Sequence, residues 1–309
     1  MQMSALLTKL ALFVIVMLIG MYGAKKNILK ADFNRGLTWL VINVFLVASI
    51  FSSVVSMDAS SLTGKEFGRI MLLLWGTYIL LYVISALLVR FLPLPVEKEK
   101  KPQFELLMSS VNTLFVTLPV VETVYGAKGA FIVALGCIPF NVILFTYGIA
   151  RLRGSAEGGF KWKDILSTPL LATVAATLLF LLRVSVPGGV RSILSAISAA
   201  TVPLSMLLVG SSLGGVKLGK AIRDRSMLFL LAERFLLAPL ITFFVMKLIC
   251  PDEMLRNIMV ITAATPSAII VTALSLQNGK DGEFPSEGIL LTTVLSMITL
   301  PITFYLLLM

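Results

Sequence analysis

Long apolar runs separated by short polar stretches dominate the chain. Each run is about 20 residues long, the length that an α-helix needs to cross the hydrocarbon core of a bilayer. The pattern therefore predicts ten membrane-spanning helices over residues 5–23, 37–57, 70–92, 103–124, 130–150, 165–184, 193–213, 227–249, 256–276 and 288–309. The expected fold class is an all-α integral membrane protein. The spans are numbered 1 to 10 in chain order below.

Composition strengthens this prediction and removes several functions. Of the 309 residues, 58% are hydrophobic and 14% are charged, whereas a soluble domain has about 25% charged residues. The chain has no histidine, which excludes histidine-based zinc sites and Ser-His-Asp hydrolysis. We expect no catalytic set, no metal site and no cofactor, and hence no enzyme.

The basic residues indicate an orientation rather than a nucleic-acid partner. The net charge is +10, and most lysines and arginines fall in the loops after spans 1, 3, 5, 7 and 9. Cytoplasmic loops of membrane proteins carry such an excess. We therefore expect a multi-pass protein of the cell (plasma or inner) membrane with both termini on the extracytoplasmic side, and no nucleic-acid partner.

A polar, glycine-containing stretch at 151–164, RLRGSAEGGFKWKD, divides the spans into two sets of five. An odd number of spans in each set gives the two sets opposite orientations in the membrane. The division predicts two inverted five-helix repeats, 1–150 and 165–309, an architecture found in many secondary transporters. Two similar hydropathy profiles that arose by chance are the alternative.

The fourth span of each half contains a proline among hydroxyl and amide side chains. Span 4 includes VNTLFVTLPVVETVYG with Pro119, and span 9 includes ITAATPSAIIVTALS with Pro266. Proline removes a helix hydrogen bond, and freed backbone groups persist at membrane depth only inside protein or beside water. We predict that helices 4 and 9 are broken at these prolines and cross; a simple kink in each is the alternative.

Two such breaks would form a binding site. The amino-terminal end of each half-helix carries about +0.5 of an elementary charge and can bind an anion without lysine or arginine. Asn112 adds an amide that both donates and accepts hydrogen bonds. The predicted substrate-binding residues are Asn112, Thr113, Thr117, Pro119, Thr265, Pro266 and Ser267.

Glu233 and Arg234 in span 8 are adjacent charges well inside an apolar segment. Charges at such depth are costly and usually functional. One interpretation is a site that binds a proton or supports the substrate site. The other is an ion pair, or side chains that extend to the cytoplasmic surface.

Four segments resemble the auxin efflux carrier family, which includes the plant PIN proteins and many bacterial permeases. They are NTLFVTLPVVETVYGAKG, PLSMLLVGSSLGG, ATPSAIIVTALSLQNGKDGE and LSMITLPITFYLLL. The resemblance implies ten helices in two inverted repeats, akin to bile-acid symporters and NhaA-type antiporters, with broken helices 4 and 9 crossed. Spans 1, 2, 6 and 7 would form a scaffold, and spans 3–5 and 8–10 a moving transport unit.

The same resemblance implies elevator-type motion, a homodimer, and contact of Asn112 with the substrate. The chain departs from the family pattern at Val47 and Thr117, where proline and glycine are common, and its 151–164 loop is short. A bacterial-type permease therefore fits better than an auxin carrier. Bacterial members are commonly linked to malate and other small organic anions.

The function expected from these features is secondary transport or facilitated passage of a small mono- or dicarboxylate. A membrane sensor that binds the solute without moving it is one alternative. A Na⁺-coupled symporter is another, although span 9 carries no acidic residue among its oxygen-bearing side chains. An integral membrane enzyme would need a catalytic set that the sequence does not show.

Overall fold

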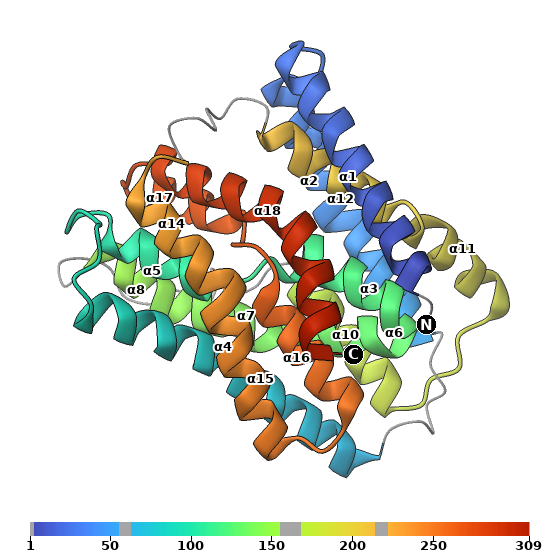
Figure 1. Cartoon of the computed structure of the whole chain (residues 1–309). Coiled ribbons are helices and arrows are strands. Elements are labelled where there is room, and N and C mark those ends of the chain that lie inside the picture. Colours follow the sequence, from blue (N-terminus) through green and yellow to red (C-terminus); the bar gives the residue numbers. More distant parts are fainter. Residues whose placement is uncertain (1–2, 56–62, 155–167, 214–221, 309) are drawn as a thin grey trace. The chain divides into compact units, whose positions relative to one another are not determined.

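The computed structural model of the protein describes residues 3–55, 63–154, 168–213 and 222–308, and these are almost entirely helical (Figure 1). The chain forms two compact units. Unit 1 consists of Met1–Met71, Leu114–Ile138 and Leu166–Gly215. Unit 2 consists of Leu72–Thr113, Pro139–Ile165 and Val216–Met309. The units interleave along the chain, and the predicted repeats 1–150 and 165–309 stay a prediction. Most of the predicted midpoint linker, from residue 155 onward, lies outside the described residues.

Unit 1 is built on close helix packing. Its helical elements are α1 (Met3–Lys25), α2 (Ala31–Leu40), η1 (Val41–Phe45), α3 (Leu46–Val55), the start of α4 (Gly64–Phe91), most of η2 (Thr113–Thr117), α6 (Leu118–Leu135), α10 (Thr168–Leu181), α11 (Gly188–Ser198) and α12 (Thr201–Leu213). A Cβ atom at Gly210 would lie 1.9 Å from the carbonyl oxygen of Met17. Only glycine therefore allows α12 to approach α1 this closely, as small residues commonly do in membrane helices.

Unit 2 holds the remaining helices around an apolar core. They are most of α4, α5 (Lys101–Ser109), α7 (Cys137–Ile143), η3 (Leu144–Gly148), α8 (Ile149–Arg153), α14 (Arg225–Ala232), η4 (Glu233–Leu237), α15 (Ala238–Ile249), α16 (Glu253–Ala264), α17 (Ile270–Gln277) and α18 (Glu283–Leu308). Phe104, Leu107, Val111, Ala263 and Val271 are buried in this core. The ends of α5 and α16 are thus embedded in apolar side chains.

Local sequence signals start several of these helices. Thr63 and Glu66 form a reciprocal capping box at the start of α4, with the Thr63 N–H 2.7 Å from the Glu66 carboxylate. Asp224 accepts from the Ser226 N–H before α14, and Asp252 accepts from the Leu255 N–H before α16. Carboxylates at these positions satisfy amide groups that the helix leaves without internal partners.

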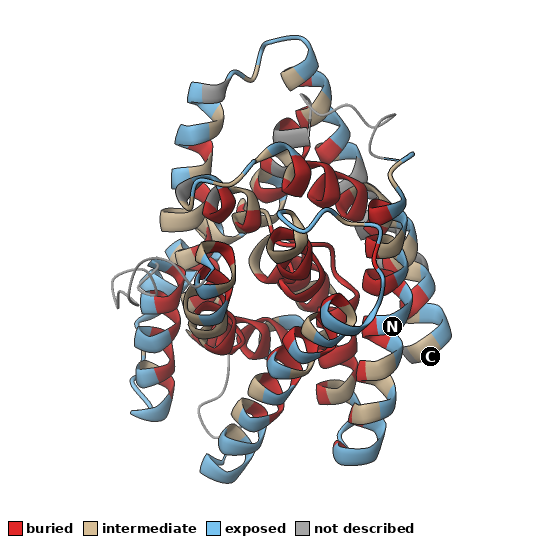
Figure 2. Cartoon of the chain, turned by 90° about the vertical axis from the view of Figure 1, so that its left-hand side faces the viewer, coloured by how far each residue is buried: buried red, intermediate tan, exposed pale blue. Residues whose placement is uncertain are grey.

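Six helical stretches among the described residues are long and apolar enough to cross a membrane. They are Asp32–Val55, Gly64–Phe91, Thr113–Arg153, Gly188–Leu208, Arg225–Ile249 and Glu283–Leu307. The long helices carry exposed as well as buried residues along their length (Figure 2). On α15 and the turn before it, Leu236, Leu240, Phe244 and Leu248 are exposed at intervals of one turn. Such an apolar stripe is typical of a lipid-facing helix. The all-helical membrane class holds, while the ten-helix inverted repeat stays a prediction.

The break in span 4 does not lie at Pro119, and that part of the prediction is wrong. Helix α5 ends at Ser109, Ser110 is extended, and helical structure resumes at Thr113. Pro119 lies in the first turn of α6, directly after the π-helical turn η2. This wide turn already departs from regular helix bonding, so the missing proline N–H does not interrupt the chain. In span 9, by contrast, Pro266 does lie in the gap between α16 and α17.

Candidate functional site

Two extended segments of unit 2, residues 110–112 and 265–268, lie antiparallel to each other, and we call this pair the crossing. Val111 and Ser267 form an isolated β-bridge. The Asn112 N–H donates to the Pro266 carbonyl over 2.8 Å, and the Ala268 N–H donates to the Ser110 carbonyl over 2.8 Å. Each break thus satisfies backbone groups of the other, as an interior without water requires.

Ser267 ties the crossing to its surroundings. Its hydroxyl donates to the Leu107 carbonyl over 2.7 Å, and its N–H donates to the Thr292 hydroxyl over 3.2 Å. Gly288 permits this arrangement, because a Cβ there would lie 2.8 Å from the Leu107 side chain. Helix α18 therefore packs directly against the end of α5.

The hydroxyl groups of span 3 reach the same crossing. Tyr78 shares a hydrogen bond of 2.9 Å with the Thr113 hydroxyl, and Tyr82 shares one of 2.9 Å with the Ser110 hydroxyl. Both tyrosines are buried, as is Asn112. The sequence prediction omitted the tyrosines. Their spacing of four residues, which places two hydroxyls on one face of an apolar helix, was the available signal.

Arg234 joins the two broken helices. One guanidinium nitrogen, Nη1, donates to the Met108 carbonyl over 2.6 Å, and the other, Nη2, donates to the Thr265 carbonyl. Met108 belongs to the last turn of α5, and Thr265 directly follows α16. A single buried side chain thus binds the carboxyl-terminal ends of both half-helices.

Glu233 precedes Arg234 at the start of the π-helical turn η4. Its side chain is fully buried, and neither carboxylate oxygen has a hydrogen-bond partner within the part of the chain that the structure describes. Such turns are rare and occur frequently at functional sites. Because both side chains are fully buried, they do not extend to the protein surface, and their role as a proton or support site stays a prediction.

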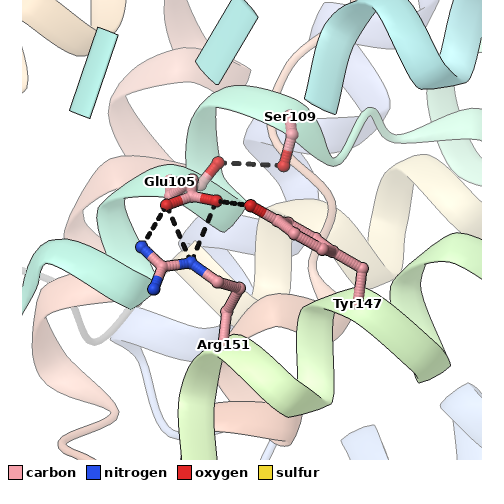
Figure 3. Close-up of polar contacts among 4 residues, drawn as sticks. All are labelled: Glu105, Ser109, Tyr147 and Arg151. Atoms are coloured by element: carbon pink, nitrogen blue, oxygen red, sulfur yellow. Dashed lines mark hydrogen bonds and ion pairs between the residues drawn. The ribbon is translucent and has the colours of Figure 1, made fainter. Parts of the chain in front are cut away.

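A second polar group holds the middle of α5 (Figure 3). The Glu105 carboxylate accepts two hydrogen bonds from the Arg151 Nε, at 3.1 and 3.0 Å, and another from the Tyr147 hydroxyl. In the same unit the Arg153 Nε donates to the Asn278 side-chain oxygen over 2.7 Å. These contacts anchor α5 to α8 and, through α8, to the end of α17. Sequence reasoning missed them, since charges at span ends resemble ordinary loop charges.

The structure divides the predicted site residues between the two units. Asn112, Thr113, Thr265, Pro266 and Ser267 meet at the crossing in unit 2. Thr117 and Pro119 belong to unit 1, so their part in a site stays a prediction.

Comparison with known proteins decides the class. A model of the family described as membrane transport protein matches residues 5–161 and 157–304. The chain belongs to this family. The resemblance to the auxin efflux carriers drawn from the sequence is thereby confirmed, and family membership favours a multi-pass carrier over an enzyme.

Two archaeal relatives extend along the same length of chain. An uncharacterized transporter of Methanocaldococcus jannaschii is 25% identical over 295 residues, covering 93% of this chain and 94% of the relative. An uncharacterized transporter of Methanothermobacter thermautotrophicus is 24% identical over 299 residues, covering 96% of each chain. The similarity therefore includes both segments of the crossing.

Proposed function

We propose that this membrane transport protein is a secondary transporter or facilitator for a small organic anion, a mono- or dicarboxylate of the malate type. The observation that carries the proposal is the crossing. Two helices are interrupted at the same place in the apolar core of unit 2, and their extended segments pair there. Backbone interruptions at membrane depth are the typical location of a transporter's binding site.

The charge preference follows from helix ends. Helical structure resumes at Thr113, directly after the first crossing segment, and at Ile270, one residue beyond the second. The aligned peptide dipoles give the amino-terminal end of a helix a partial positive charge. Asn112 adds an amide at the same place. These donors suit a carboxylate, because anions bind at helix amino termini without an added basic side chain.

Several further features belong to the proposal. Transport would proceed by an elevator movement, in which the solute site travels with the helices that hold the crossing. The protein would act as a homodimer in the cell membrane with both termini on the extracytoplasmic side. The excess of basic residues in alternate loops supports this orientation.

Uptake into proteoliposomes tests the proposed site. We expect Asn112→Ala to raise the KM for the best substrate of a mono- and dicarboxylate panel at least about tenfold, since a hydrogen bond to a charged group contributes about 1.5–3 kcal/mol. Asn257→Ala is the matched control. Asn257 is also buried in unit 2, but it precedes the end of α16 by about 10 Å at the rise of a helix.

Two results would contradict the proposal. Unchanged uptake by Asn112→Ala would remove Asn112 from the site. Thermal stabilisation of purified protein by a carboxylate, without flux of any tested carboxylate across the membrane, would favour a sensor that binds the solute without moving it.

A further inference from the structure

The carboxyl-terminal ends of α5 and α16 present an electrostatic problem. A helix leaves its last carbonyl groups without internal partners, and together they carry about −0.5 of an elementary charge. Both ends lie in the buried core of unit 2, where unmatched polar groups are costly. Two negative helix ends that meet in such a place need a positive partner.

The side chain of Arg234 is that positive partner. The Ser267 hydroxyl satisfies the Leu107 carbonyl, and Arg234 satisfies both Met108 and Thr265. The two guanidinium nitrogens bind carbonyls from two different helices. A planar guanidinium presents several donors in a fixed fork, which matches two acceptors held at a set distance.

We propose that the Arg234 guanidinium is a built-in cation that binds both half-helix ends and holds the crossing in its binding-competent geometry. In transporters with broken helices, such carboxyl-terminal ends and unwound carbonyls commonly coordinate a bound Na⁺. Here a tethered side chain occupies the corresponding place. Arg234 is thus a positioning residue: it acts on Asn112 and Pro266 through the backbone and does not touch the solute.

Glu233 is the neighbour of this cation in the sequence. Its side chain is fully buried one residue before Arg234. The carbonyl oxygens of Met108 and Thr265 form an oxygen-lined place for one positive group. Removal of the guanidinium therefore leaves a place that a small diffusible cation can fill.

Chemical rescue tests this inference on purified protein by thermal unfolding, a measurement that does not depend on transport. Arg234→Ala is expected to melt at a lower temperature than the wild type and to regain part of the loss in low millimolar guanidinium. Urea, a neutral molecule of the same shape, is expected to give no recovery. Arg256→Ala is the control. Its position on α16 precedes the helix end by about 12 Å, and guanidinium should not stabilise it.

Equal effects of urea and guanidinium would overturn the charge role. If Arg234→Ala cannot be purified, Arg234→Lys and Arg234→Gln replace it, because lysine keeps the charge and glutamine keeps only donors. Lysine is expected to preserve folding better than glutamine, and the reverse order would overturn the proposal.

The role in transport rests on the proposed function and has its own measurement. Wild-type uptake is expected to be the same when K⁺ replaces Na⁺, and uptake by Arg234→Ala is expected to recover at least in part with guanidinium. A strict Na⁺ requirement of the wild type would contradict a built-in cation. Absence of uptake of every carboxylate would contradict the proposed function, while the thermal rescue would still decide the role of Arg234.

Discussion

Arg151 and Arg234 are both guanidinium groups bound by oxygen atoms of α5, one at the middle of the helix and one in its last turn, yet they are bound in different ways. Arg151 is 39% exposed and pairs with the carboxylate of Glu105. Arg234 is fully buried and binds two backbone carbonyls from two helices. The first group contacts a full negative charge, and the second contacts partial charges only.

This difference predicts how much stability the protein loses when each contact is removed. When the Glu105 partner is removed, solvent can hydrate the exposed part of Arg151, so the loss is moderate. When Arg234 is removed, the Met108 and Thr265 carbonyls at two helix ends remain buried without their donor. A group that is buried and left uncompensated costs several times more than a surface pair contributes.

The largest expected effect therefore comes from Arg234→Met, which keeps the length of the side chain and removes its charge. We expect a loss of about 2–6 kcal/mol in the free energy of unfolding, because the substitution leaves two buried helix-end carbonyls without a donor, at about 1–3 kcal/mol each. Uptake of the best carboxylate should be lost with it. Denaturant unfolding in detergent measures the first effect, and proteoliposome uptake the second.

The double variant Arg234→Met/Glu233→Gln sharpens this prediction. Replacing both buried charges removes the unpaired carboxylate, so the double variant should be more stable than Arg234→Met alone. Equal stability of the single and double variants would show that Glu233 does not depend on Arg234. Glu233→Gln by itself provides the fourth corner of the cycle.

A smaller loss of stability is expected at the partly exposed contact between Glu105 and Arg151. Glu105→Gln should lower the free energy of unfolding by about 1 kcal/mol, after allowance for the partial exposure of Arg151. Arg151→Gln should cost more, about 1–3 kcal/mol, because it leaves the buried Glu105 carboxylate without its cation. A double-mutant cycle on thermal unfolding measures their coupling. This coupling should decrease at high salt, because the screening length falls from about 10 Å at 0.1 M to about 3 Å at 1 M.

The buried Arg234–Glu233 coupling provides the control for salt. It should change little over the same range, since buried charges are screened much less than exposed ones. Equal salt dependence of the two couplings would mean that water reaches both arginines, and the comparison would fail.

The sequence predicts the membrane class and part of the crossing for clear physical reasons. Apolar runs of spanning length need no tertiary information, because each span is apolar on its own. Pro266 marks a break since a missing N–H acts locally. Asn112 stands out because an amide is unusual in an apolar segment. These signals identified five residues that meet at the crossing.

The remaining features depend on contacts between distant segments. The break at Ser110 contains no proline, and it is stabilised by hydrogen bonds with Pro266 and Ala268, far along the chain. The partners of Arg234 are backbone carbonyls, which exist at every position and leave no mark in the sequence. Pro119 is the strongest local signal for a break in span 4, yet the helix continues through it. It lies in the first turn of α6, directly after the wide π-helical turn η2.

The smallest expected effects concern the two tyrosines beside the crossing. Tyr82→Phe removes the partner of the Ser110 hydroxyl, and Tyr78→Phe removes the partner of the Thr113 hydroxyl. Each substitution should cost about 1 kcal/mol in unfolding free energy, the usual contribution of one buried hydrogen bond. The two should differ in transport. Tyr78→Phe should raise KM, because Tyr78 binds Thr113, a predicted substrate-binding residue. Tyr82→Phe should leave KM unchanged, because its partner Ser110 lies two residues after Met108, whose carbonyl binds Arg234. A rise in KM for Tyr82→Phe alone would instead place the solute at Ser110. The site would then lie near the carboxyl-terminal ends of the broken helices. There the positive charge of Arg234 would attract the anion, and the helix amino termini would not.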